Sequence, residues 1–131
     1  MRKVNLADLS SQLLDTFVEV EGRILSSEPE MLLRSAVFRC PSCNLEARDP
    51  PSDRCGRCGA PLEFLPRRSE WEDLRRVELT DGTLVVPLAV RGNPPAIGTP
   101  VRVTGRYVIL GGEARILVSS ITPVEEVVEY G

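Results

Sequence analysis

Two Cys-x-x-Cys pairs constrain this 131-residue chain more than any other feature. They are Cys40-Pro41-Ser42-Cys43 and Cys55-Gly56-Arg57-Cys58, with eleven residues between them, and the chain has no histidine that could compete as a ligand. Each pair suits one tight turn that aims both sulfurs at the same ion, and Asn44 and Gly59 follow the turns, where a left-handed backbone is often needed. The pattern predicts a tetrahedral Zn²⁺ site within a zinc ribbon. Its four ligands are Cys40, Cys43, Cys55 and Cys58.

Three other uses of four cysteines stay open at this point. Two disulfide bonds would suit a small secreted domain, but no apolar run follows Met1, Arg2 and Lys3, so the sequence predicts no signal peptide and a cytoplasmic location. An iron centre of the rubredoxin type would use the same four thiolates. A catalytic zinc ion is disfavoured, because such an ion keeps one position open beside three protein ligands.

Charge and composition narrow the classes of function. Sixteen basic and nineteen acidic residues give a formal net charge of -3, so binding to a polyanion would depend on a local basic patch. The chain has no histidine, no cysteine outside the two pairs and no motif of paired carboxylates, which indicates a protein that is not an enzyme. No apolar run is long enough to span a bilayer, and no membrane partner is expected.

The segment before the first cysteine pair predicts a helix and two strands. Asn5 is a good N-cap for a short helix over residues 5–15, with Asp8 three positions later. Residues 17–25 alternate apolar and polar side chains as a half-buried strand does, and Gly22 within them is typical of a bend in a small barrel. Residues 31–39 predict a second strand that leads into the first cysteine pair.

The remainder of the chain predicts further short strands joined by turns. Thr80-Asp81-Gly82-Thr83 indicates a type I′ hairpin, and Pro87 in the returning strand is expected at an edge or bulge. Residues 101–108 and 114–121 predict the last two strands. The fold class is therefore all-β: a five-stranded OB-fold barrel with an inserted four-cysteine zinc ribbon and a short N-terminal helix. The expected parts are the barrel and helix at 1–39 and 65–122, the ribbon at 40–64 and an acidic tail at 123–131.

A series of motifs suggests a family. The series is Val18-Glu19-Val20-Glu21-Gly22-Arg23-Ile24, Ala36-Val37-Phe38 before the first cysteine pair, Ser69-x-Trp71-x-Asp73-Leu74 after the second, and Gly98-x-Pro100-Val101-Arg102-Val103-Thr104-Gly105. Over about residues 13–110 it resembles the N-terminal domain of the minichromosome maintenance (MCM) replicative helicases. The resemblance implies an OB-fold with a zinc ribbon between strands, which binds single-stranded DNA and helps to form hexameric rings. No phosphate-binding Gly-x-x-x-x-Gly-Lys-Ser/Thr loop occurs in the chain, so no ATPase activity is expected.

Basic and aromatic residues on the expected strands are the candidates for nucleic-acid contacts. They are Arg34, Arg39, Arg75, Arg76, Arg102 and Arg106 for phosphates and Tyr107 for base stacking. Trp71 is the other large aromatic considered for stacking, and it is expected instead to pack the ribbon onto the barrel. The resemblance places Leu32 and Glu78 where the family has DNA-contacting basic residues, which leaves open whether those contacts survive.

The sequence thus predicts a non-enzymatic nucleic-acid-binding module with Zn²⁺ as its cofactor. Single-stranded DNA is favoured over RNA as the ligand, in replication or repair, with replication proteins as further partners. Two alternatives stay open: a protein-interaction subunit of a larger complex, and an RNA-binding or ribosome-associated OB-fold factor. The sequence leaves the oligomeric state open.

Overall fold

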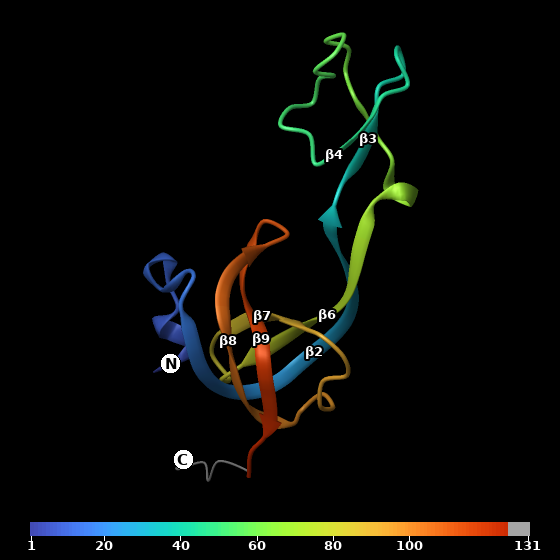
Figure 1. The fold of residues 1–131 in the computed structure, drawn as a ribbon. Helices are drawn as coiled ribbons and strands as arrows, with labels where there is room; N and C mark the ends of the chain where they lie inside the picture. Colours follow the sequence, from blue (N-terminus) through green and yellow to red (C-terminus); the bar gives the residue numbers. More distant parts are fainter. Residues whose placement is uncertain (126–131) are drawn as a thin grey trace. The chain divides into compact units, whose positions relative to one another are not determined.

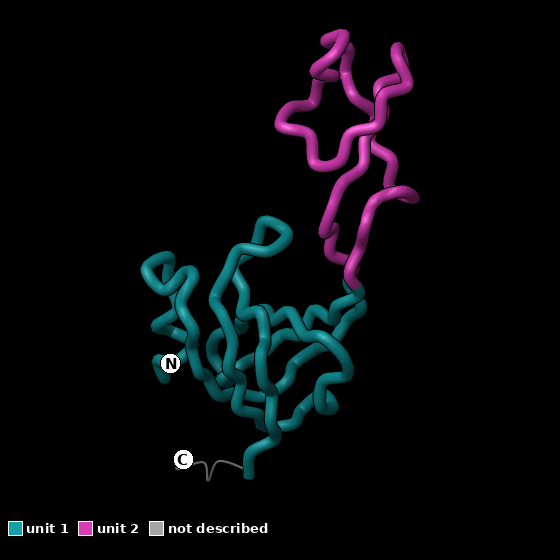
Figure 2. The backbone as a smooth tube through the Cα atoms, viewed as in Figure 1, with its two compact units in different colours: residues 1–30, 73–131 teal, residues 31–72 magenta. Residues whose placement is uncertain are grey.

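The computed structural model describes residues 1–125, which form β-strands and three 3-10 turns. In chain order the elements are β1 (Arg2–Lys3), η1 (Leu6–Asp8), η2 (Ser11–Leu13), β2 (Phe17–Ser35), β3 (Val37–Arg39), β4 (Glu46–Arg48), β5 (Glu63–Phe64), η3 (Pro66–Arg68), β6 (Glu70–Thr80), β7 (Val85–Val90), β8 (Pro100–Leu110) and β9 (Glu113–Pro123) (Figure 1). They belong to two compact units: residues 31–72, and residues 1–30 together with the chain from residue 73 onward (Figure 2). Residues 126–131 of the expected acidic tail lie outside the described residues.

Five strands of the first unit close into a barrel. The neighbour order is β2, β6, β7, β9, β8, and β8 pairs again with β2. The β6–β7 and β8–β9 pairs are antiparallel, whereas β7 and β9 run parallel. This is an OB-type barrel, and the predicted all-β fold class is confirmed. Within the described residues no helix is long and apolar enough to cross a membrane.

The barrel interior is filled by the alternate residues of its strands. Along β8, Val101 and Val103 are fully buried while Arg102 and Arg106 point outward, as the period of two requires. The same alternation in the other strands supplies the rest of the core. Its fully buried members include Val18, Val20, Ile24, Val77, Leu79, Leu88 and Ile116.

Two glycines permit the close strand approaches that the barrel needs. A Cβ atom added at Gly22 would lie 2.7 Å from the backbone oxygen of Thr80, and one at Gly105 would lie 2.3 Å from that of Leu117. The β8–β9 register also shifts between Thr104 and Gly105. The predicted role of Gly22 at a barrel bend agrees with this packing.

The segment before the first cysteine pair departs from the prediction of two separate strands. Residues 17–35 form the single strand β2, so the inserted unit follows the first barrel strand and not the second. The break expected between residues 25 and 31 is absent because β6 side chains hold this part of β2: Ser26 Oγ donates to Glu78 Oε1 at 2.7 Å, and Arg75 Nε donates to Ser27 Oγ at 2.9 Å. Side-chain pairing along the strand overrides the local turn signal.

The expected helix over residues 5–15 is instead the two 3-10 turns η1 and η2. Ser10 between them is extended, with φ of -148° and ψ of 172°. Serine disfavours a helix interior because its side chain competes for backbone hydrogen bonds, and Ser10-Ser11 interrupts the helix where it would have to continue. Both turns still bury a leucine against the barrel, Leu6 in η1 and Leu13 in η2.

The β6–β7 connection is a turn at the predicted place but not of type I′. Gly82 has a positive φ of 97°, whereas Asp81 does not. The Asp81 carboxylate instead accepts the backbone N–H groups of Thr83 and Leu84, both at 2.8 Å. Pro87 pairs with Glu78 of β6 and lies one residue before the parallel β7–β9 ladder, so its missing N–H removes no bond from that ladder.

The second unit contains the segment expected to form the ribbon. It spans Met31–Glu72 and carries a three-stranded sheet in the order β4, β3, β5. Phe38 of β3 lies opposite Ala47 on one side and Phe64 on the other. The two cysteine pairs lie between strands of this sheet in the chain, the first between β3 and β4 and the second between β4 and β5.

Candidate metal centre and nucleic-acid interface

The two cysteine pairs adopt the same backbone turn. In the first, Cys40 N donates to Leu45 O and Asn44 N to Cys40 O; in the second, Cys55 N donates to Ala60 O and Gly59 N to Cys55 O. Asn44 and Gly59 have positive φ values of 61° and 76°. The predicted left-handed residue after each pair is therefore confirmed, and the repeated geometry turns all four sulfurs to one point.

The sulfur positions fit a tetrahedral metal ion. All four Sγ atoms lie within 4.8 Å of one another, with Cys40 and Cys58 at 3.4 Å and Cys43 and Cys55 at 3.7 Å. A tetrahedron with metal–sulfur bonds of about 2.3 Å has edges of about 3.8 Å. The cluster can hold a metal ion, and its four ligands leave no open coordination position.

Backbone N–H groups prepare part of the site for thiolates. The N–H of Cys43, followed by the Cys58 thiol and the Ser42 N–H, lowers the pKa of Cys40 to about 6. The N–H groups of Cys58 and Arg57 likewise lower the pKa of Cys55. The pKa of Cys58 is raised to about 11: the Ala60 N–H acts to lower it, but the Cys40 sulfur and burial outweigh that effect. Four sulfurs this close cannot all be thiolates without a cation, and a bound metal ion supplies that charge.

The predicted arginines of the barrel unit all have partners within it. Arg102 Nη2 lies 3.1 Å from Glu21 Oε1, and Arg106 Nη2 lies 3.6 Å from Asp15 Oδ1. Arg76 forms a short ion pair with Glu113, which raises the pKa of the arginine and lowers that of the glutamate. Arg75 hydrogen-bonds Ser27 on β2. Arg102 and Arg106 share the outward face of β8, as predicted.

The two predicted arginines of the second unit are also paired. Arg34 Nε lies 2.9 Å from Glu72 Oε2, and Arg39 Nη2 lies 3.6 Å from Glu63 Oε2. Both arginine side chains stay about half exposed, at 50% and 45%. At such exposure the pairs are weak, so a phosphate could replace the carboxylates.

The prediction of Tyr107 as a stacking platform is wrong. Tyr107 is 8% exposed and belongs to the hydrophobic core, so its ring offers no open face to a base. Tyr107 occupies a buried position of β8, whereas Arg106, the residue before it, lies on the outer face. Leu32 and Glu78 stand where the resemblance places DNA-contacting basic residues of the family. Leu32 is half-buried in β2, and Glu78 accepts a hydrogen bond from Ser26.

Sequence reasoning missed one aromatic group and one buried ion pair. The rings of Phe38 and Phe64 have centroids 5.3 Å apart, and those of Phe64 and Trp71 have centroids 6.5 Å apart. Arg115 is 3% exposed, and its Nη2 lies 2.7 Å from Glu30 Oε1. Local patterns gave no signal for either, because the partners meet only in the folded chain.

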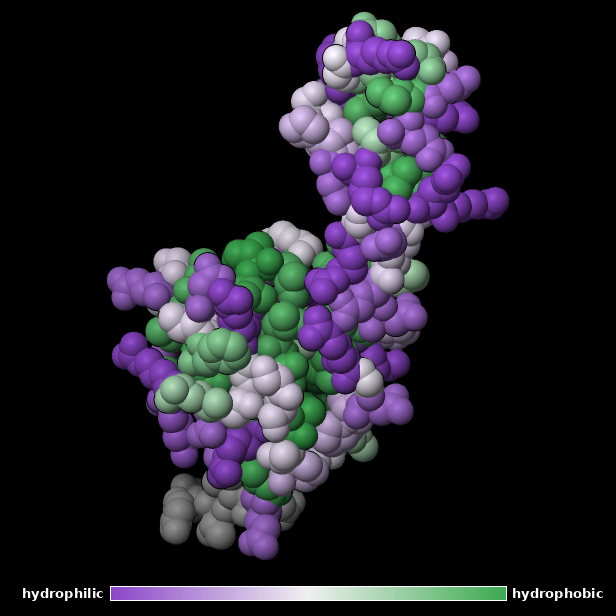
Figure 3. Space-filling view, viewed as in Figure 1, coloured by the Kyte–Doolittle hydropathy of each residue, from purple (hydrophilic) through white to green (hydrophobic). Residues whose placement is uncertain are grey.

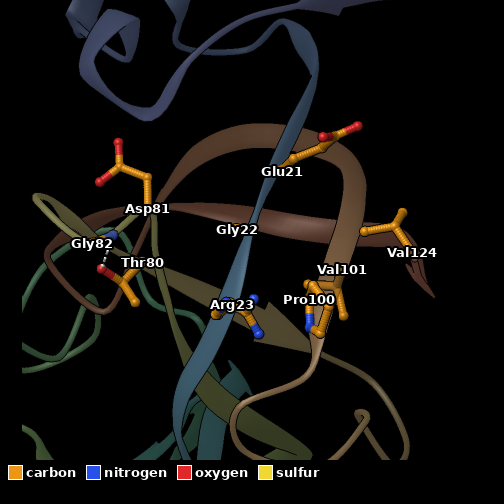
Figure 4. Close-up of a pocket in the computed structure, with 9 residues that line it drawn as sticks. All are labelled: Glu21, Gly22, Arg23, Thr80, Asp81, Gly82, Pro100, Val101 and Val124. Carbon is orange, nitrogen blue, oxygen red and sulfur yellow. Dashed lines mark hydrogen bonds between the residues drawn. The ribbon is translucent and has the colours of Figure 1, made fainter. Parts of the chain in front are cut away.

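A cavity of about 330 Å³ is lined by residues of β2, of the β6–β7 turn and of the start of β8 (Figure 4). Gly22, Pro100, Val101 and Val124 line it together with polar groups that already have partners: Glu21 pairs with Arg102, and Asp81 accepts two N–H groups of its own turn. The Thr80 hydroxyl donates to Leu84 O and accepts from Gly82 N. The lining thus contains no nucleophile with a base beside it.

Comparison with known proteins identifies a solved structure with a similar fold. No protein-family model matches the chain, and no curated protein matches it. Among solved structures, the chain is similar to a 1.8 Å crystal structure of the N-terminal domain of an archaeal MCM, with a TM-score of 0.67 at 19% sequence identity. The fold is that of an MCM N-terminal domain. The likeness covers 94% of this chain and 62% of the solved one, so the chain spans less than two thirds of the domain that it matches.

The MCM-type fold agrees with the motif series found in the sequence. Strand β2 carries the first motif, β8 carries the last, and the four-cysteine unit lies between β2 and β6. The likeness establishes architecture, while ligand and process are matters of proposal.

Proposed function

We propose that the protein is a non-enzymatic module that binds single-stranded DNA in the cytoplasm, in replication or repair. The observation that carries the proposal is the barrel interrupted after its first strand by a four-cysteine unit, the architecture shared with the MCM N-terminal domain. An OB barrel binds single strands on strands and loops that border its open groove. Non-specific single-strand binding needs no catalytic group.

We propose Zn²⁺ as the metal at Cys40, Cys43, Cys55 and Cys58. Thiolates are soft ligands, and a closed tetrahedral set of four suits a structural zinc ion. Metal analysis of protein purified without added metal tests this: one zinc per chain is expected. Iron, with the visible absorption of an iron–thiolate centre, would contradict the assignment.

Binding on the barrel would require phosphates to replace carboxylates. Arg76, Arg102 and Arg106 each face an acidic partner, so a bound strand gains each phosphate contact at the expense of an internal ion pair. We therefore expect modest affinity, strong weakening by salt and little dependence on base sequence.

Fluorescence anisotropy tests the function directly. Labelled single-stranded DNA, duplex DNA and RNA of equal length are titrated with metal-loaded protein at two salt concentrations. Salt-sensitive binding that favours single-stranded DNA is expected. Tighter binding of RNA would make the protein an RNA-binding factor, and equal binding of duplex DNA would contradict a single-strand module.

Paired variants identify the binding face. Replacing both Arg102 and Arg106 by alanine should weaken all single strands alike and reduce the salt slope by about two. The matched control, Glu21→Gln with Asp15→Asn, removes their carboxylate partners and should strengthen binding. Selective loss for particular sequences, or the same direction of change in both double variants, would contradict this interface.

One observation favours a second function, that of a protein-interaction subunit. Arg75, Arg76, Arg102, Arg106 and Arg115 of the barrel unit are all engaged by residues of that same unit. The exposed ion pairs of Arg102 and Arg106 among them give the barrel a surface of mixed charge, which suits a protein interface. Absence of binding to all three oligonucleotides would favour this second function over the first.

A further inference from the structure

The second unit exposes two aromatic rings that touch each other. Trp71 is 40% exposed and Phe64 is 38% exposed, and their rings meet edge to face at 6.5 Å. Phe38 lies behind Phe64, with its ring centroid at 5.3 Å. Figure 3 shows hydrophobic patches among the charged side chains of this unit. Exposed aromatic rings that touch each other make a contiguous apolar surface, and such a surface is a candidate contact site for a ligand.

The indole of Trp71 is fixed by a hydrogen bond. Its Nε1–H donates to the backbone oxygen of Pro66 at 2.9 Å, which ties the ring to the turn η3. The polar edge of the indole is therefore satisfied within the protein, and the exposed part of the ring is apolar. A ring held in this way loses little conformational entropy when a ligand stacks on it.

A free positive charge lies next to this pair of rings in the chain. Arg67 directly follows Pro66, is exposed, and makes no hydrogen bond or ion pair with any described residue. Two other arginines of this unit are paired: Arg68 Nη1 lies 2.7 Å from Glu46 Oε1, and Arg48 Nη1 lies 3.1 Å from Glu70 Oε1. Arg67 can bind an anion without first giving up a carboxylate, unlike Arg76, Arg102 and Arg106 of the barrel.

We propose that Phe64 and Trp71 form a stacking platform for an unpaired base of a single-stranded nucleic acid, with Arg67 contacting an adjacent phosphate. An exposed aromatic face with an uncompensated guanidinium close to it in the chain matches a ligand that has both a π-face and a negative charge. A duplex keeps its bases stacked inside and cannot use the platform. This inference rests on the proposed function and adds the second unit to its binding surface.

The fluorescence of Trp71 tests the platform in the unmodified protein, because Trp71 is the only tryptophan of the chain. Metal-loaded protein is titrated with oligothymidylate and, separately, with an abasic phosphodiester strand of the same length. Stacking predicts quenching by oligothymidylate and little change with the abasic strand. Equal quenching by both strands, or quenching by neither while oligothymidylate is bound, would overturn the proposal.

Variants test the platform through affinity. Trp71→Leu keeps apolar bulk without an aromatic face and should weaken oligothymidylate binding about tenfold or more, whereas Trp71→Phe should retain most of it. Arg67→Ala should weaken the oligothymidylate and the abasic strand alike. Phe17→Leu is the matched control, since Phe17 is 52% exposed in the barrel unit, and it should leave affinity unchanged. Metal content of each variant checks that the cysteine site still forms.

The two proposals fail in different ways. No anisotropy change with any single strand refutes the proposed function and the platform with it. Binding that is unaffected by Trp71→Leu, without quenching of Trp71, refutes the platform alone and leaves the barrel as the binding surface.

Discussion

At the scale of single residues, the barrel depends on a glycine that local patterns do not mark as special. A Cβ atom at Gly105 would lie 2.3 Å from Leu117 O and 2.8 Å from a methyl group of the fully buried Ile116, and the backbone oxygen cannot turn away. Gly105→Ala should therefore lower the free energy of unfolding by about 1–3 kcal/mol. Urea denaturation measures the change. Gly56→Ala is the control: its Cβ meets nothing within 4 Å, and an effect within about 0.5 kcal/mol is expected.

Asp81 should give the protein an acid-sensitive turn. The N–H groups of Leu84 and Thr83 lower the pKa of its carboxyl below the ordinary 3.8. Because the folded-state pKa is the lower one, the contribution to stability is present above the ordinary value and is lost as pH falls through the lowered value. Asp81→Asn keeps the acceptor oxygen and should remove this part of the acid dependence, measured by urea denaturation at about pH 7 and about pH 3. An unchanged acid dependence in the variant would contradict this account.

At the scale of elements, the buried pair between Arg115 and Glu30 ties the β8–β9 hairpin to β2. Arg115 Nε also donates to Leu110 O at 3.1 Å, and the side chain is 3% exposed. Glu30→Ala would leave a buried guanidinium without its carboxylate, so a loss of about 3 kcal/mol in the free energy of unfolding is expected. Chemical denaturation measures it.

The exposed pair of Arg102 and Glu21 provides the comparison for that prediction. Its side chains are 47% and 33% exposed, so Glu21→Gln should cost less than about 1 kcal/mol. Equal losses in the free energy of unfolding for Glu30→Ala and Glu21→Gln would show that burial of Arg115 does not increase the contribution of its ion pair to stability.

At the scale of the whole molecule, the two units should respond differently to metal removal. The buried apolar residues of the second unit are Val37, Cys40 and Cys55, two of which are metal ligands, so the metal site is most of its core. The barrel has a continuous aliphatic core of its own. Chelation, or Cys43→Ser, should therefore unfold residues 31–72 and leave the barrel folded. Amide hydrogen exchange should show lost protection in β3–β5 and retained protection in β8; unchanged protection throughout would refute a structural metal.

Comparison of prediction and structure shows where local information was sufficient. The clustering of the four cysteines and the positive φ at Asn44 and Gly59 follow from the two short cysteine motifs and the residues next to them, and both were predicted correctly. The 3-10 turns near Ser10, the single strand β2 and the burial of Tyr107 were missed. Each of these depends on a partner distant in the chain or on competition between local hydrogen bonds, which a pattern of apolar residues does not record.

The sequence by itself determined the four-cysteine cluster, the all-β class and the alternation that separates core from surface in β8. Those features follow from spacing, turn chemistry and the period of two, which act over a few residues. Only the tertiary structure decided which arginines already have carboxylate partners and which aromatic rings stay exposed. The packing of the folded chain sets both, since it places Glu113 against Arg76 and Phe64 against Trp71 while leaving Arg67 unpaired among the described residues.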